Sequence, residues 1–319
     1  MLRLILNYLS QASWARQVVE RWGFAKKTAA RFVAGETLDE AIRVVKELHS
    51  RGIRTTLDHL GENVNSREGA IQAAEEILGI IDRLTKESVP SGVSIKLSQI
   101  GLILNQELCE NNLLHILKSA CNNQIFLRID MEDSQLTQAT LDTFSKISGR
   151  GYKDFTGIVI QSSLYRSERD VEALLAADHK IRICKGAYKE SRRVAYPKKR
   201  AVDENFDRIT KLLLKKSHET GSLVSPDGGI PPIAAIATHD QARIEFAVTA
   251  GNQIGLNKKG LEFQMLYGIR EDLQESLVSQ GYPVRVYVPY GKEWYPYFVR
   301  RLAERPANLW FFISNLFRR

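Results

Sequence analysis

Short strand-like and helical segments alternate along almost the whole chain, and this alternation limits the possible folds more than any other feature. The strand-like runs are bounded by turns and cover residues 53–62, 92–98, 124–130, 156–162, 180–186, 233–240, 261–268 and 283–291. A helical pattern at 39–49 precedes the first of them, and others separate most of the rest, for example over 135–148, 168–177, 203–219, 241–250 and 271–280. Such alternation favours a parallel sheet, because each parallel connection needs a long crossover.

Eight such units in about 250 residues match the size of a closed (β/α)₈ barrel. We therefore expect an α/β fold, a distorted TIM-type barrel over residues 51–308. An N-terminal helical arm is expected over 1–50 and an amphipathic C-terminal segment over 309–319. A doubly wound sheet is the alternative fold, and the absence of a GxGxxG motif after the first strand disfavours it.

The composition excludes several classes of function. The formal charge is +8, with 44% hydrophobic and 26% charged residues, which is ordinary for a globular protein apart from the positive balance. Lysine and arginine are spread along the chain without a basic run that interleaves aromatic residues, so we expect no nucleic-acid partner. A positive field suits an anionic small molecule or an anionic lipid surface.

The cysteines and the first residues bear on location. Cys109, Cys121 and Cys184 show no metal-binding or redox spacing, which is typical of a reducing compartment. The opening segment MLRLILNYLSQ is apolar but too short to span a bilayer, and no small-residue cleavage site follows it. These observations predict a cytoplasmic protein.

Polar residues stand at or just after the ends of the predicted strands, where barrels of this kind carry their sites. They are Asp58 with Glu62, Lys96, Asp130 with Glu132, Gln161, Arg182 with Lys185, Thr238 with His239, Tyr267 after the apolar Leu266, and Tyr287. A cation buried without a partner costs several kcal/mol. We therefore expect the lysines and arginines of this set to meet acids and an anionic ligand. The alternative is that each one extends from the rim into water.

The helical segment WYPYFVRRLAERPAN (294–308) has an unusual charged face. At helical spacing Tyr297, Arg300, Arg301 and Glu304 share one face, beside an apolar face that includes Phe298. Such a face suits either water or an anion, and we expect Arg300 and Arg301 to join the cations of the strand ends.

Two further features lie at strand ends. In the run KGAY (185–188), Gly186 lets the main chain approach a ligand closely, although a glycine at this place is also an ordinary turn residue. His239 suits a general base, a ligand contact or a buried structural histidine. No second histidine or cysteine stands at metal-ligand spacing, so no metal site is expected.

The chain resembles the proline dehydrogenase family, flavin-dependent enzymes that oxidise proline to 1-pyrroline-5-carboxylate. The resemblance covers about residues 50 to 310 and is carried by SIKLS (94–98), RIDME (128–132), VIQS (159–162), RICKGAY (182–188), ATHD (237–240), EFQMLYG (262–268), RVYVPYG (285–291) and YFVRRLAERPAN (297–308). It implies a barrel that holds FAD without a dinucleotide-binding motif.

The resemblance also implies roles for individual residues. Lys96, Arg300 and Arg301 would hold the carboxylate of L-proline, while Tyr287, Tyr297 and Leu266 would enclose its ring. Tyr287 would favour proline over 4-hydroxyproline. The implied FAD contacts are Met131, Gln161, Arg182, Lys185, Gly186, Ala187, Thr238 and His239. Arg182 would lie beside the flavin, and Asp130 would be the acid at the catalytic centre. Glu62 would pair with a clamp arginine when substrate closes the site.

The expected partners follow from the same family. It passes electrons to a quinone, so a peripheral contact at the inner face of the membrane is chemically reasonable. The C-terminal aromatic residues, among them Trp310 and Phe317, suit packing on the barrel or such a contact. Lys189 stands where large bifunctional relatives commonly have tryptophan, and 319 residues leave no room for an aldehyde dehydrogenase domain. We therefore expect the single-activity branch, with the oligomeric state open.

Three alternative functions remain open from the sequence. One is another flavin barrel, such as methylenetetrahydrofolate reductase. The second is a phosphate-binding aldolase in which Lys185 forms a Schiff base. The third is a basic protein that binds a membrane surface and carries no flavin.

Overall fold

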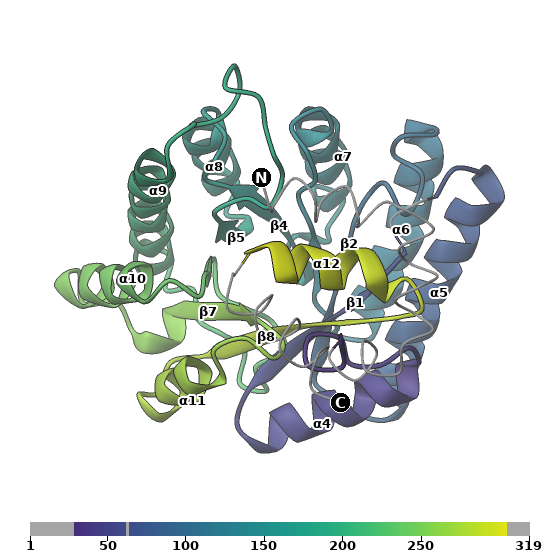
Figure 1. Cartoon of the computed structure of the whole chain (residues 1–319), viewed down its shortest axis with the longest axis horizontal. Coiled ribbons are helices and arrows are strands. Elements are labelled where there is room, and N and C mark those ends of the chain that lie inside the picture. The colour runs from purple at the N-terminus through teal and green to yellow at the C-terminus, as the bar shows by residue number, and fades with distance from the viewer. Residues whose placement is uncertain (1–28, 62–63, 305–319) are drawn as a thin grey trace, which may run out of the picture.

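Eight parallel strands close into one barrel in sequence order, β1 to β8 (Figure 1). The structure, a computed structural model, describes residues 29–61 and 64–304. The strands are β1 (Arg54–His59), β2 (Ser91–Ile95), β3 (Leu127–Ile129), β4 (Thr156–Gln161), β5 (Lys180–Cys184), β6 (Ala234–Ala237), β7 (Leu261–Leu266) and β8 (Val284–Tyr290). β1 pairs with β8, for example Thr56 with Tyr287, and this pairing closes the barrel. The predicted TIM-type barrel is confirmed, and the doubly wound sheet is wrong.

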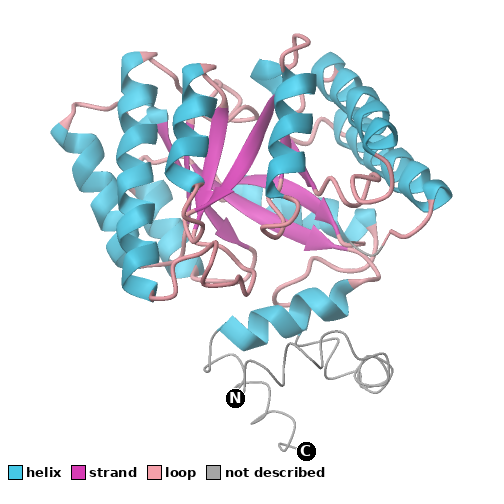
Figure 2. Ribbon diagram, turned by 90° about the horizontal axis from the view of Figure 1, so that it is seen from above, coloured by secondary structure: helices cyan, strands magenta, loops and turns pink. Residues whose placement is uncertain are grey.

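Helices surround the barrel on its outside (Figures 1 and 2). They are α4 (Leu38–Ser50), α5 (Arg67–Lys86), α6 (Gln106–Asn122), α7 (Thr137–Ser148), α8 (Ser167–Ala176), α9 (Lys199–Glu219), α10 (Gln241–Gln253) and α11 (Glu271–Ser279), with short 3₁₀ turns at Lys153–Phe155 and Lys258–Gly260. Polar caps begin several of them: Thr37 accepts a hydrogen bond from the Glu40 amide in a full capping box, and Ser66 caps α5. Helix α9 begins four residues before the predicted start.

Strand residues alternate between an apolar outer layer and a polar interior. On β3, Leu127 and Ile129 belong to the hydrophobic core, whereas Arg128 between them is a buried charged residue. On β7, Phe263 and Met265 belong to the core, and Glu262 and Gln264 alternate with them. Because neighbouring strand residues point to opposite faces, the core lies between strands and helices while polar side chains fill the barrel.

The helix α12 (Trp294–Glu304) lies across the mouth of the barrel (Figures 1 and 2). Trp294, Tyr295, Phe298 and Val299 form a second hydrophobic cluster with residues such as Phe32. Trp294 Nε1 also donates a hydrogen bond to Glu36 Oε1 at 3.2 Å. This apolar anchoring holds the arginine-bearing helix against the end of the barrel where the strands finish.

All three predicted segments extend beyond the described residues, the barrel segment only at 62–63 and 305–308. The C-terminal segment 309–319 and residues 1–28 of the N-terminal arm are not described. The rest of the arm includes α4, whose Ile42, Val45 and Leu48 pack in the core beside β1. The division at residue 50 stays a prediction.

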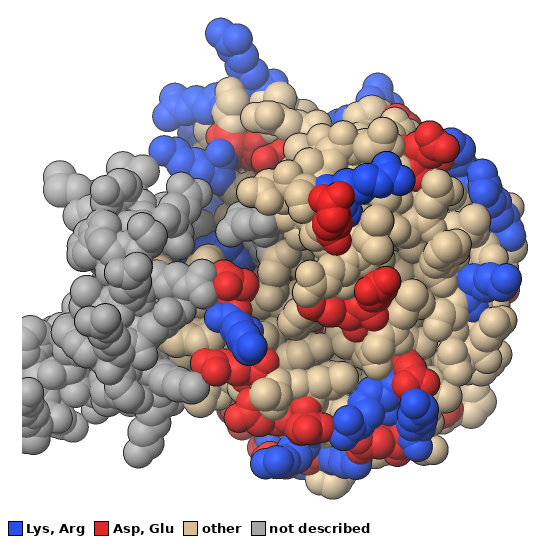
Figure 3. Space-filling model, turned by 90° about the vertical axis from the view of Figure 1, so that its right-hand side faces the viewer, with Lys and Arg blue, Asp and Glu red and all other residues tan. Residues whose placement is uncertain are grey.

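Acidic and basic side chains are interspersed on the face seen in Figure 3. Between α4 and α5, Lys46 lies 2.6 Å from Glu87, and Arg83 lies 2.6 Å from Asp39. The positive balance of the chain is therefore not gathered into one patch there. None of the described helices combines the length and the apolar character that crossing a bilayer requires.

Candidate active site

A cavity of about 650 Å³ opens where the barrel strands end. Every predicted site residue that the structure describes lines it: Lys96, Asp130, Met131, Gln161, Arg182, Lys185, Gly186, Ala187, Thr238, His239, Leu266, Tyr287, Tyr297, Arg300 and Arg301. Glu62 lies outside the described residues. The cavity thus brings together these residues from the ends of seven strands, β2 to β8, and from α12.

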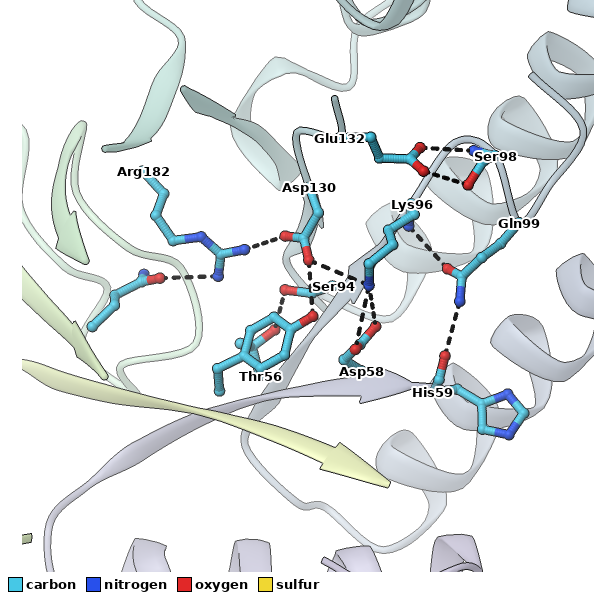
Figure 4. Close-up of polar contacts among 12 residues, drawn as sticks. Thr56, Asp58, His59, Ser94, Lys96, Ser98, Gln99, Asp130, Glu132 and Arg182 are labelled. Atoms are coloured by element: carbon cyan, nitrogen blue, oxygen red, sulfur yellow. Dashed lines mark hydrogen bonds and ion pairs between the residues drawn. The ribbon is translucent and has the colours of Figure 1, made fainter. Parts of the chain in front are cut away.

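Asp130 is the centre of a buried network of charges (Figure 4). Its Oδ1 accepts a hydrogen bond from Arg182 Nη2, and its Oδ2 accepts one from Tyr287 Oη at 2.8 Å. Lys96 Nζ lies 3.8 Å from Asp130 Oδ2 and 3.3 Å from Asp58 Oδ1. These cations meet acids as expected, because a charge in this interior needs a partner.

The pKa of Tyr287 is raised well above its usual value by burial and by the nearby Asp130 and Asp58 carboxylates. The phenol therefore stays protonated and can donate to Asp130 over the whole physiological pH range. Burial likewise raises the pKa of the Cys184 thiol to about 11, which favours the neutral thiol over the thiolate at the cavity wall.

Side-chain hydrogen bonds hold the loop after β2 in place (Figure 4). Gln99 Oε1 accepts from the Lys96 amide at 2.9 Å, and Gln99 Nε2 donates to the His59 carbonyl at 2.9 Å. Glu132 accepts from the Ser98 amide at 3.0 Å. Glu132 and Tyr267, which also follow strand ends, are not among the residues that line the cavity. For Glu132 the contacts indicate a structural role.

The charged face of α12 is turned toward the cavity. Arg300 and Arg301 both line it, and Arg301 is only 8% exposed. The Arg301 Cζ lies 4.9 Å from the centre of the Tyr297 ring, and that of Arg300 lies 6.0 Å from it, within the range of cation–π attraction. The alternative that this face simply meets bulk water is therefore wrong for Arg301.

The chain after β5 forms a close turn at the cavity wall. Gly186 has φ = +114°, and a Cβ at this position would collide with Ser163 Oγ. The next amide, of Ala187, donates to Gln161 Oε1 at 3.3 Å, while Gln161 Nε2 donates to the Glu132 carbonyl at 2.7 Å. Only glycine fits both the conformation and the space, which leaves the main chain exposed to a ligand.

Lys185 is held between two acids. Its Nζ lies 2.6 Å from Asp240 and 2.5 Å from Asp203. Burial alone would raise the pKa of each aspartate, but their hydrogen bonds and charge pairing with lysine outweigh it and lower the pKa of both. An ammonium group in two ion pairs is poorly suited to the Schiff-base role of an aldolase.

One ring nitrogen of His239 accepts a hydrogen bond from the backbone. Its Nε2 accepts a hydrogen bond from the Leu266 amide at 2.9 Å, which links the end of β6 to β7. That nitrogen is therefore not available as a general base, and the ring is tied to the wall of the cavity. Within residues 29–61 and 64–304 no group of three or more His, Cys, Asp or Glu side chains could hold a metal ion.

Several cavity residues carried no assigned role in the sequence. Asp58, noted as a strand-end acid, is 1% exposed and partners Lys96. Gln264 lines the cavity and accepts a hydrogen bond from Arg182 Nη1 at 3.2 Å. The available signal was the alternation of Glu262 and Gln264 with apolar residues in a buried strand, which places both side chains inside the barrel.

A barrel whose strand ends gather cations, acids and tyrosines around a concave site has the arrangement of a barrel enzyme with a small-molecule site. Residues 41–313 match the family model for proline dehydrogenase. The chain belongs to the proline dehydrogenase family and is an oxidoreductase.

Individual relatives agree with this assignment. The chain is 38% identical to proline dehydrogenase 2 of Bacillus subtilis over 309 residues, covering 97% of this chain and 96% of the relative. It is 38% identical to a proline dehydrogenase of Deinococcus radiodurans over 291 residues, covering 90% and 89%. The crystal structure of proline utilization A from Bdellovibrio bacteriovorus, inactivated by N-propargylglycine, superposes with a TM-score of 0.78 at 26% identity. That match covers 88% of this chain and 33% of the longer one.

Proposed function

We propose that this protein oxidises L-proline to 1-pyrroline-5-carboxylate with FAD as the hydride acceptor and a quinone as the final electron acceptor. This is the first step of proline catabolism to glutamate. The observation that carries the proposal is the gathering of Lys96, Arg300 and Arg301 around one cavity whose walls include Tyr287 and Tyr297. Membership of the proline dehydrogenase family supports it.

The three cations suit the carboxylate of the substrate. A guanidinium group offers a planar pair of donors that matches a carboxylate, and each such bond contributes roughly 1.5–3 kcal/mol. Proline offers few other polar atoms, so its remaining binding energy comes from apolar contact with Tyr287, Tyr297 and Leu266. The Tyr287 side chain, held by Asp130, limits the space beside the ring, which favours proline over 4-hydroxyproline.

The residues on the other side of the cavity fit FAD. The turn at Gly186 lets the main chain approach a flavin closely, Lys185 and Arg182 offer N–H donors on the cavity wall, and the cavity of about 650 Å³ has room for a flavin ring. We assign the FAD contacts to Met131, Gln161, Arg182, Lys185, Gly186, Ala187, Thr238 and His239. Bound FAD supplies a hydride acceptor, a chemistry that no side chain offers.

Asp130 and Arg182 are the proposed catalytic pair. With the carboxylate held by the α12 arginines, the proline ring has one orientation relative to this pair, and such positioning supplies up to ~7–11 kcal/mol of a reaction barrier. Asp130 keeps Arg182, Tyr287 and Lys96 in fixed relation to one another. Either Asp130 or water takes the proton from the amine.

The remaining partners extend the proposal. Glu62 is assigned to pair with a clamp arginine when substrate closes the site. Electrons pass to a quinone, and a peripheral contact with the membrane would bring the protein to that acceptor. The aromatic C-terminus is a candidate for such a contact.

The test is to purify the protein and add L-proline without oxygen. We expect a yellow protein whose visible flavin absorbance bleaches, with a product two hydrogens lighter than proline and slower bleaching by 4-hydroxyproline. Reduction of a quinone on reoxidation completes the test. A colourless protein, or a flavin that proline leaves oxidised, would contradict the proposal. Covalent trapping of substrate on Lys185 by borohydride would support an aldolase instead.

A further inference from the structure

Gln264 on β7 makes hydrogen bonds in two directions inside the barrel. Its Oε1 accepts from Arg182 Nη1 at 3.2 Å, and its Nε2 donates to Glu262 Oε1 at 2.6 Å. The side chain is buried at 4% exposure, and it lines the cavity. It therefore links an arginine of the site to an acid deeper in the barrel.

Glu262 is held in turn by Arg285 on β8. Arg285 Nε lies 2.9 Å from Glu262 Oε1, and Nη2 lies 3.1 Å from Glu262 Oε2. The other guanidinium contacts of Arg285 are to the carbonyls of Thr55 at 2.9 Å, Gly228 at 2.8 Å and Gly229 at 3.2 Å. Glu262 is 0% and Arg285 3% exposed, so this ion pair is shielded from water, and its two hydrogen bonds hold both side chains in place.

The Glu262–Arg285 ion pair determines which way the Gln264 amide points. A carboxylate that is paired with a guanidinium only accepts hydrogen bonds, so the NH₂ group of Gln264 must face Glu262. The carbonyl oxygen then faces Arg182. On its other side Arg182 donates to Asp130, as Figure 4 shows. The Arg182 guanidinium thus donates hydrogen bonds on both sides, to Gln264 and to Asp130.

We propose that Gln264 is a positioning residue that holds the Arg182 guanidinium at the flavin side of the cavity, with the Glu262–Arg285 pair setting the direction of its amide. The inference rests on the proposed function, in which Arg182 faces the flavin. A glutamine that merely fills the barrel would affect stability alone. A positioning residue also changes the rate of flavin reduction and the flavin midpoint potential.

The first test uses Gln264→Met in the flavin-loaded full-length protein. Methionine keeps the approximate volume and removes both hydrogen bonds. We expect the limiting rate of flavin reduction by L-proline to fall about 10- to 100-fold, the effect of losing one hydrogen bond to a charged group. The proline concentration for half the limiting rate should change less than about twofold, because the α12 arginines are untouched.

The matched control is Thr56→Val. Thr56 is a buried residue of β1 whose Oγ1 bonds Ser94 Oγ at 3.1 Å, and it does not line the cavity. The control should lower thermal stability by a similar amount while leaving the flavin potential and the reduction rate within about twofold of wild type. If Gln264→Met behaves in the same way, Gln264 is structural only and the inference is wrong.

A second variant, Gln264→Asn, shortens the side chain by one methylene and leaves the Glu262–Arg285 pair intact, so the barrel should fold even where Gln264→Met fails. The shorter amide cannot bond Glu262 and Arg182 at the same time, so the Arg182 guanidinium loses its fixed position. The flavin midpoint potential measured by dithionite titration should therefore shift from that of wild type. An unchanged potential would overturn the inference.

The two proposals fail differently. If proline does not reduce the wild-type flavin, the proposed function is wrong, while the dithionite titrations still decide whether Gln264 acts on the flavin through Arg182. If proline reduces the wild type and the Gln264 variants match it in rate and in potential, only the inference about Gln264 is wrong.

Discussion

Tyr287 Oη on β8 lies 2.8 Å from Oδ2 of Asp130, the residue after β3, and this hydrogen bond joins residues 157 positions apart across the barrel interior. The same carboxylate accepts from Arg182 and lies 3.8 Å from Lys96 Nζ. One aspartate thus orients a phenol, a guanidinium and an ammonium group. A single substitution there should disturb several functions of the site together.

Asp130→Asn should slow flavin reduction by L-proline about 10- to 100-fold, because Arg182 loses a charged partner. Anaerobic stopped-flow absorbance at the flavin band measures this rate. Asp133→Asn is the control: Asp133 Oδ1 accepts from the Gln135 amide at 2.9 Å, and an asparagine retains that acceptor. Equal rates for Asp130→Asn and wild type would remove Asp130 from the catalytic centre.

Arg300→Met and Arg301→Met should each abolish or severely reduce proline turnover while FAD stays bound. Loss of one charge-assisted contact raises the half-saturating proline concentration about 10- to 100-fold. Steady-state kinetics and the ratio of flavin to protein absorbance give both quantities. Arg169→Met, on the exposed surface of α8, should change neither. Loss of flavin from the α12 variants would show that these arginines hold the cofactor instead.

Gly186→Ala should release FAD from a protein that still folds. The new Cβ would collide with Ser163 Oγ and would lie 3.1 Å from Gln161 Oε1, at a backbone angle of +114°. Gly151→Ala is a matched control, since Gly151 also has positive φ, at +98°, but has nothing within 4 Å of the new Cβ. The flavin content after gel filtration should fall severalfold in the first variant only. Full flavin occupancy in Gly186→Ala would exclude the proposed cofactor turn.

Stability at alkaline pH should depend on Tyr287. Its pKa is raised in the folded state by burial and by Asp130 and Asp58, so the folded protein holds the proton more tightly than the unfolded chain. Folding stability is therefore fully present below the ordinary tyrosine pKa of about 10 and falls above it, by up to about 1.4 kcal/mol per pH unit for this group. Urea unfolding at pH 8 and pH 11 should show a smaller loss for Tyr287→Phe than for wild type. Tyr165→Phe, which removes a 44% exposed phenol, should match wild type, and equal losses in all three proteins would contradict the prediction.

Much of the fold follows from local patterns. Each predicted strand is present, because β-branched runs bounded by turns encode their own secondary structure. The polar residues at their ends mark the rim, since parallel strands all finish at one end of a barrel. The site residues named from family resemblance therefore gather in one cavity. Glu62 and the C-terminal aromatic residues lie outside the part of the chain that the structure describes.

The hydrogen-bond and ion-pair partners of those site residues could not be predicted from the sequence. Lys96 pairs with Asp58 across 38 positions, and Arg182 meets Gln264 across 82. Nothing in the sequence distinguished Gln264 from other residues of a buried strand, and only the tertiary structure shows its contact with Arg182 on β5. Likewise, the charged face of α12 suited water as well as an anion until the hydrophobic cluster around Phe298 placed the helix at the barrel mouth.

The sequence by itself determined eight strand–helix units and a polar rim, because secondary structure and strand direction depend on residues close together in the chain. Only the tertiary structure decided which acid meets which base, because those pairs form when β1 closes against β8 and brings distant strand ends around a common interior.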